Sequence, residues 1–252
     1  MDILYVIGNH LSEWYNNELR YSLRCLDKNG LNVGRVFVVG YRPPFLNPDT
    51  VTFIPCKDET NVKHYNILHC IEQAVKQTDI GTPNGGDFLY SSDDHFYVQP
   101  TNFDKYPHYW RGVELPTEAK TEYQRTLFST RELLQTCGLP TYHLAWHGNT
   151  WFNRNAFLER RFELIRKFAQ TMPDGCEPTC LMLNYLIGTG RLKIEDFTYR
   201  EDCKLGASAT TEGVVFTAQQ REVISANDNI ERTEFGKWLM RNYRKPSIYE
   251  VQ

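Results

Sequence analysis

Hydrophobic and polar positions divide the first hundred residues into two kinds of segment. Residues 13–29 and 61–78 repeat apolar side chains every three or four positions, as helices with one buried face do. Four short, continuous, β-prone runs instead predict strands that are buried on both faces: residues 3–7, 35–39, 51–54 and 87–91. This alternation predicts an α/β fold with a mostly parallel central sheet flanked by helices.

The second half of the chain has a less regular pattern. Helices are predicted over four segments: residues 129–137, 154–169, 177–187 and 230–243. Two further segments are predicted to be short strands: residues 195–199 and 214–217. Because no repeat, low-complexity tract or clear linker interrupts the sequence, we expect a single domain over residues 1–252.

Composition and charge restrict the class of partner. The 252 residues are 41% hydrophobic and 23% charged, which is the balance of an ordinary globular protein. The net charge of −3 gives no overall positive field, so nonspecific binding to nucleic acid is not predicted. The basic stretch 237–245 is a local exception, and it keeps contact with DNA open.

Cysteine usage and the length of apolar runs indicate a compartment. The seven cysteines are odd in number and include no CxxC pair, which favours free thiols in a reducing environment. Residues 1–8 are predicted to form a strand rather than a signal peptide. No segment approaches the roughly 18–20 apolar residues of a membrane span. We therefore expect a cytoplasmic protein without an integral membrane span, and the sequence leaves its oligomeric state open.

Two adjacent carboxylates, Asp93 and Asp94, follow directly on the apolar run 87–91. In open α/β sheets, ligands bind at the carboxyl ends of the strands, where this pair is predicted to lie. Adjacent like charges repel, and a hard divalent cation such as Mn²⁺ or Mg²⁺ removes that repulsion while also binding substrate phosphates. A cation site for a phosphate-bearing substrate is therefore the functional interpretation, and a solvated turn is the alternative.

This acidic segment resembles the DxD element of GT-A glycosyltransferases in its Asp-Asp-hydrophobic form. Other parts of the chain are similar to bacterial capsule-type sugar transferases, including the Stealth family of sugar-phosphate transferases: residues 18–24 (Glu-Leu-Arg-Tyr-Ser-Leu-Arg), 44–47, 225–228 and 243–250. The resemblance implies a GT-A (Rossmann-like) fold. It also implies a nucleotide-sugar-binding half over residues 1–100 and an acceptor-binding half over residues 101–252.

Two departures from the Stealth pattern bear on the reaction. Residues 6–9 lack the acidic residue of the Stealth N-terminal segment, and residues 147–149 replace its His-x-Pro element. These losses favour glycosyl transfer over sugar-phosphate transfer.

The resemblance also implies roles for the metal-site residues. Asp94 would be the primary metal ligand, and Asp93 would bind the metal, a metal-bound water or the ribose. His147 aligns with the histidine of the related transferases, so it would coordinate the metal, hold a phosphate or orient the acceptor. A structural histidine bonded to the backbone remains an alternative for His147.

Four residues near predicted strand or helix ends are candidates for binding the donor. Gly8 allows close approach of a ligand to the backbone, and Asn9 can bond to a base or ribose. Lys63 and Asn66 lie at the start of the second predicted helix, where the helix N-terminus favours anions. A simple turn at 8–9 and an exposed first helical turn are the alternatives.

The second half supplies candidates for the acceptor and for catalysis. Trp151 lies in an aromatic- and histidine-rich segment whose rings could stack on a sugar or base. Glu177 and Asp228 are candidate catalytic carboxylates, since an inverting transferase needs a base at the acceptor hydroxyl, but both also suit helix caps. Lys245 could neutralise a phosphate or could be solvated.

The sequence thus predicts a metal-dependent hexosyl- or pentosyltransferase that uses a nucleotide-diphosphate sugar, with UDP as the expected nucleotide. Its acceptor would be a surface polysaccharide or a hydroxymethylated DNA base. A sugar-1-phosphate transferase and a non-catalytic sugar-nucleotide binding protein are the alternatives. Retaining and inverting chemistry are not distinguished by the sequence.

Overall fold

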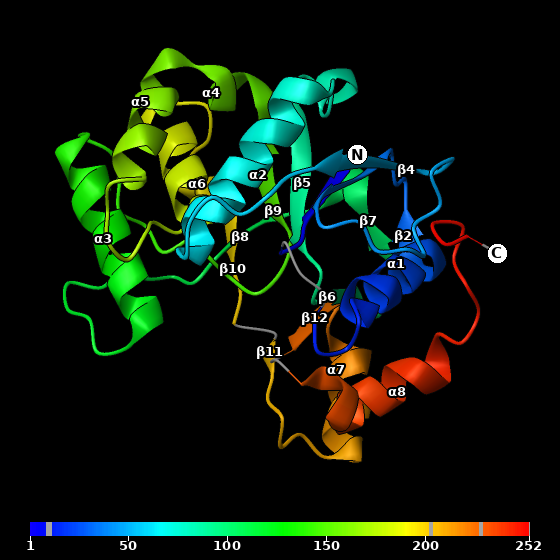
Figure 1. The fold of residues 1–252 in the computed structure, drawn as a ribbon. Helices are drawn as coiled ribbons and strands as arrows, with labels where there is room; N and C mark the ends of the chain where they lie inside the picture. The colour runs from blue at the N-terminus through cyan, green and yellow to red at the C-terminus, as the bar shows by residue number, and fades with distance from the viewer. Residues whose placement is uncertain (9–11, 202–203, 227–228, 252) are drawn as a thin grey trace.

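A computed structural model describes residues 1–8, 12–201, 204–226 and 229–251 (Figure 1). Its centre is a five-stranded sheet in the order β4-β3-β1-β5-β9. The strands are β1 (Ile3–Val6), β3 (Val36–Gly40), β4 (Val51–Pro55), β5 (Asp87–Ser92) and β9 (Thr150–Asn153). The first four are mutually parallel and β9 runs antiparallel to β5, so the predicted mostly parallel sheet is confirmed.

Helices cover both faces of this sheet (Figure 1). One face packs against α2 (Lys63–Gln77), α3 (Glu122–Thr136), α4 (Arg154–Leu158), α5 (Arg160–Ala169) and α6 (Pro178–Gly188). The other packs against α1 (Asn17–Asn29), and the hydrophobic core on that side also includes residues of α7 (Thr211–Gln220) and α8 (Glu234–Asn242). Alternation along β1 divides the core accordingly: Leu4 and Val6 point to the first face, and Ile3 and Tyr5 to the second.

Short strands outside the central sheet join distant parts of the chain. They are β2 (Gly30–Leu31) with β7 (Thr101–Asn102), β8 (His108–Trp110) with β10 (Phe197–Tyr199), and β6 (His95–Tyr97) with β12 (Val223–Ala226) and β11 (Lys204–Leu205). Single 3₁₀ turns lie at Thr82–Asn84, Phe103–Lys105, Ile194–Asp196 and Ile230–Arg232. Because β12 pairs antiparallel with β6, a segment near the C-terminus lies beside the strand that follows Asp94.

Three predicted helices or strands differ clearly from the structure. The predicted helix 230–243 is interrupted at Thr233, whose extended backbone (ψ 163°) separates the 3₁₀ turn Ile230–Arg232 from α8. The predicted strand at 214–217 is wrong, because these residues lie inside α7. The side chain of Thr210 caps that helix by accepting the amide of Gly213, and Val214 and Ala218, one turn apart, supply its buried face. The predicted helix 154–169 is interrupted at Glu159, whose extended backbone (ψ 141°) separates α4 from α5.

Among the described residues, no helix combines the length and the apolar character that crossing a membrane requires.

Candidate active site

The acidic pair lies at the carboxyl edge of the parallel strands. β5 ends at Ser92, and Asp93 and Asp94 form the turn that leads into β6. The Nδ1 atom of His95 accepts the amide of Ser92 at 3.2 Å, and only 5% of His95 is exposed. His95 therefore closes the turn from inside, with its ring proton on Nε2.

Buried hydroxyl groups fix the position of this turn relative to β1 and α1. The hydroxyls of Tyr5 in β1 and Ser22 in α1 lie 3.1 Å apart, and Ser22 donates to the carbonyl of His95. The Tyr97 hydroxyl donates to Ser91 Oγ at 3.5 Å. Because buried polar groups need partners, this network gives the turn one position relative to the sheet.

The environment of Asp93 disfavours its negative charge. Burial raises the pKa of Asp93 to about 7, and the carboxylates of Asp94 and Glu18 add to the rise, while the Lys63 ammonium opposes it. Asp94 is half-buried and accepts a hydrogen bond from Ser225 Oγ at 3.2 Å. An excess of negative charge is therefore held in one place, as a cation-binding site requires.

Glu18 is a third carboxylate beside this pair, and it was not among the predicted site residues. It lies in the first turn of α1, and Ser12 Oγ donates to its Oε2 at 2.7 Å. Burial raises its pKa, and the charges of Glu231 and Asp94 contribute to the rise. Glu18 begins the segment 18–24 on which part of the resemblance rests, and that was the only signal available in the sequence.

The N-terminus of α2 contributes a positive group. Lys63 is the first residue of this helix and is exposed, and its charge reaches Asp93. Burial and the neighbouring Lys63 lower the pKa of His64 to about 4, so His64 is neutral at physiological pH. The structure therefore brings Lys63 and the acidic pair to the same site.

Asn66 faces the loop that precedes α2. Its Oδ1 accepts the amides of Glu59 (3.1 Å) and Thr60 (3.2 Å), and its Nδ2 donates to the Thr60 carbonyl at 2.7 Å. These bonds give Asn66 a role in shaping the loop that leads to Lys63.

Glu177 is buried at the N-terminus of α6. It is 9% exposed, and its carboxylate accepts the amide of Cys180 at 2.6 Å, as an N-cap does. Burial raises the pKa of Glu177 to about 7. Burial likewise raises the pKa of the Tyr90 phenol, and the charges of Glu177, Asp94 and Asp93 contribute, so Tyr90 lies within electrostatic range of all three.

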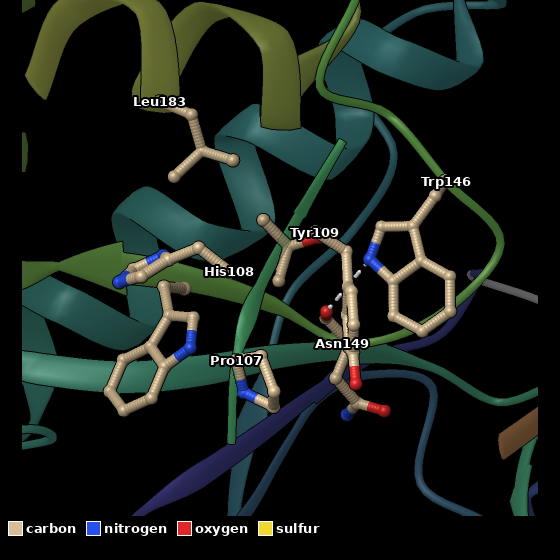
Figure 2. A pocket seen from close by; sticks show the side chains of 8 residues that line it. Pro107, His108, Tyr109, Trp146, Asn149 and Leu183 are labelled. Atoms are coloured by element: carbon tan, nitrogen blue, oxygen red, sulfur yellow. Dashed lines mark hydrogen bonds between the residues drawn. The ribbon is translucent and has the colours of Figure 1, made fainter. Parts of the chain in front are cut away.

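His147 lies in the loop before β9, close to the network below the acidic turn. It is half-buried, and its neighbour Asn149 donates from Nδ2 to the hydroxyl of Tyr97. The Trp146 indole donates to the Asn149 carbonyl at 3.3 Å (Figure 2). The loop that carries His147 is therefore connected, through Asn149, to the buried hydroxyl network behind the acidic turn.

Trp151 contributes to a small hollow beside that loop. Its indole nitrogen donates to the Tyr106 carbonyl at 3.0 Å. The centroid of its ring lies 5.3 Å from the centroid of the His108 ring. Figure 2 shows Trp146, Asn149 and other residues that line this shallow surface depression. Trp151 is half-buried, so only part of its ring remains for a ligand.

The remaining predicted residues are divided between the site, a remote surface and undescribed positions. Gly8 is exposed just beyond β1, whose Val6 is in register with Ser92 of β5, so it lies at the same sheet edge. Lys245 is exposed on the C-terminal tail. This tail contacts α1 at Arg24, whereas Glu18, the residue of α1 beside the acidic pair, lies in the first turn of the helix. Asn9 and Asp228 lie outside the described residues.

The donor chemistry of the acidic pair fits an oxygen-preferring divalent cation. Asp93 and Asp94 present adjacent carboxylates, and the raised pKa of Asp93 reports a charge excess that a cation would relieve. Within the described part of the chain, no group of three or more His, Cys, Asp or Glu side chains is arranged to hold a metal. Substrate phosphates and water would therefore complete a coordination shell begun by the two aspartates.

The sequence matches no known family and no curated protein. Among solved structures, the chain is similar to the galactosyltransferase LgtC in complex with donor and acceptor sugar analogues. These two chains share 13% identity with a TM-score of 0.44, over 91% of this chain and 88% of that one. An active-site mutant of LgtC gives 15% identity and a TM-score of 0.45, over 90% and 87%.

Proposed function

We propose that this protein is a GT-A-type glycosyltransferase that moves a sugar from a nucleotide-diphosphate donor to an acceptor hydroxyl. One observation carries the proposal: an adjacent carboxylate pair, with the pKa of Asp93 raised to about 7, lies at the carboxyl edge of a parallel sheet. Ligands of open α/β sheets bind at this edge. The resemblance of residues 90–96 to the DxD element supports the same interpretation.

In this proposal, Asp94 and Asp93 hold Mn²⁺ or Mg²⁺. When bound, the cation would stabilise the negative charge on the departing nucleoside diphosphate. Lys63, at the N-terminus of α2, binds the phosphate groups, since its ammonium and the helix dipole both favour anions. Gly8 lies where a base or ribose could approach the backbone, and Asn9 remains a predicted contact to that part of the donor.

Glu177 is the proposed catalytic carboxylate. A general base works best when its pKa lies near the working pH, and burial brings that of Glu177 to about 7. Its N-capping bond fixes the orientation of the group. Asp228 remains a hypothesis for a second catalytic group.

The acceptor side of the proposal rests on two residues. His147 and Trp151 are proposed to contact the acceptor or a phosphate, and His147 is a further candidate metal ligand. Lys245 remains a predicted phosphate contact, but its position on the tail beside α1 gives that role no support. The acceptor itself is proposed to be a surface polysaccharide or a hydroxymethylated DNA base.

A labelled-donor assay tests this function. Purified protein is incubated with UDP-sugars and Mn²⁺, with glycan acceptors in one series and hydroxymethylated DNA in another. We expect release of UDP and a labelled acceptor in one series, and loss of at least 10²-fold in D94N. Asp104, exposed on the surface, provides the matched control D104N, which should keep full activity. Release of UMP would instead indicate sugar-1-phosphate transfer, and undiminished transfer by a D93A/D94A double variant would refute the proposal.

A further inference from the structure

Ser225 connects the C-terminal part of the chain to the acidic pair. It lies in β12, where its Cα is in register with that of His95 in β6. Its side chain is fully buried, and its Oγ donates to Asp94 Oδ2 at 3.2 Å. A bond across 131 residues of sequence therefore ends on the carboxylate proposed as the main cation ligand.

The type of donor matters as much as its position. A serine hydroxyl is neutral, so it orients Asp94 without cancelling the negative charge that a cation needs. An Arg or Lys at this place would pair with the carboxylate and compete with the metal. Among the residues that the structure describes, a second donor near Asp94 is His95 Nε2, which lies 3.8 Å from Oδ1, beyond hydrogen-bond distance. Of these two donors, Ser225 lies within hydrogen-bond distance of the Asp94 carboxylate and His95 lies beyond it.

We propose that Ser225 is a positioning residue that holds the Asp94 carboxylate in the orientation that binds the divalent cation. This inference rests on the proposed function. Hydrogen-bonding partners of metal ligands fix the ligand's orientation, and their loss typically weakens metal binding by about 10–100-fold. The side chain has no part in the β12–β6 pairing, which main-chain atoms make, so its removal leaves the strands paired.

The chain offers a matched control in Ser247. Ser247 is 2% exposed and its Oγ also donates to a carboxylate at 3.2 Å, in this case Glu250 Oε1. Glu250 pairs with Arg24, away from the acidic pair. The variants S225A and S247A thus remove the same bond at two places, and only the first touches the proposed cation site.

The test measures Mn²⁺ binding directly, with calorimetric titration and with the electron paramagnetic resonance signal of free Mn²⁺. Full-length wild type, S225A, S225T, S247A and D94N are compared, and thermal unfolding in EDTA reports their stability without metal. We expect S225A to bind Mn²⁺ about 10–100-fold more weakly. We expect S225T to recover most of the affinity and S247A to match wild type.

The failure of this inference is distinguishable from that of the proposed function. If D94N loses Mn²⁺ binding while S225A binds within twofold of wild type, Ser225 has no positioning role and the metal site stands. Equal weakening in S225A and S247A would reduce the effect to general destabilisation and overturn the inference. Unchanged binding in D94N would overturn both. Should S225A unfold in EDTA, S225T decides: affinity at the wild-type level supports the role, and affinity as weak as that of D94N excludes it.

Discussion

Arg24 and Glu250 form a two-pronged ion pair that fastens the C-terminal tail to α1. Arg24 Nε lies 2.7 Å from Glu250 Oε1, and Nη2 lies 2.8 Å from Oε2. Both side chains are largely buried, with 12% and 5% exposed. The pair joins the segments 18–24 and 243–250, which the resemblance to sugar transferases singled out separately. Those segments are thus in contact, and α1 also supplies Glu18 to the acidic site.

Breaking this ion pair should destabilise the fold. In E250Q, the buried Arg24 guanidinium loses its counter-charge, and removing one partner of a buried pair costs about 3–5 kcal/mol. Urea denaturation would measure the free energy of unfolding. The matched control is E163Q, since Glu163 pairs with Arg160 and Lys167 on the exposed face of α5, where ion pairs contribute little, and it should match wild type. Equal stability of E250Q and wild type would show that the tail is not fastened in this way.

The sequence predicted four of the five strands of the central sheet because each is a short, continuous apolar run, and the structure confirms them. It did not predict the fifth, β9, which runs antiparallel at the edge of the sheet and is not a continuous apolar run. It also predicted that Asp93 and Asp94 follow a strand end, since that depends on local order alone. It did not predict that Glu18 and Ser225 approach the pair. Their approach depends on the packing of α1 and on the β12–β6 pairing, and neither leaves a local pattern.

Local propensity also gave a wrong prediction at two places in the chain. Val214, Val215 and Phe216 are typical strand residues, but the Thr210 cap and the single buried face of α7 outweigh that preference. The helical pattern around Glu159 gave no sign that its backbone is extended. Lys245 is the last residue of the basic stretch 237–245, and its role as a phosphate contact stays a prediction.

The raised pKa of Glu177 predicts a pH-dependent stability. With a pKa of about 7 in the folded protein against about 4.5 unfolded, the neutral buried form favours folding below pH 4.5. That contribution is lost as the pH rises to 7, by up to about 3 kcal/mol. E177Q keeps a cap acceptor without ionising, so its unfolding free energy should fall less than that of wild type between pH 5 and 8. If the unfolding free energies of the two proteins change equally with pH, ionising Glu177 does not destabilise the folded protein.

Glu177 as the catalytic base predicts a second property of the same variant. E177Q should lose at least about 10²-fold in kcat, the usual size of general acid–base catalysis. Donor binding, measured as the thermal shift with UDP-sugar and Mn²⁺, should remain as in wild type. Wild-type kcat in E177Q would restrict Glu177 to its capping role.

Lys63 should affect donor binding rather than chemistry. K63Q removes a charge that faces the proposed phosphate site, and we expect the donor KM to rise about tenfold, equivalent to about 1.4 kcal/mol. Because Lys63 is exposed, the difference from wild type should shrink at high salt. K57Q, which changes an exposed lysine in the preceding loop, is the control and should leave KM unchanged. A change in kcat alone would contradict this assignment.

The charge excess at the acidic pair predicts that D93N is more stable than wild type when no cation is present. At pH 8, wild-type Asp93 ionises beside Asp94 and Glu18 although burial and those charges raise its pKa to about 7. Replacing it with a neutral amide removes that cost, on the order of 1–2 kcal/mol after allowance for its partial exposure. Thermal unfolding in EDTA should therefore give a higher Tm for D93N, whereas added Mn²⁺ should stabilise wild type and leave D93N unchanged. D104N, with its carboxylate exposed, should behave as wild type in both conditions. A lower Tm for D93N in EDTA would mean that the Asp93 carboxylate already has a stabilising partner within the protein, and that a cation is not what the site lacks.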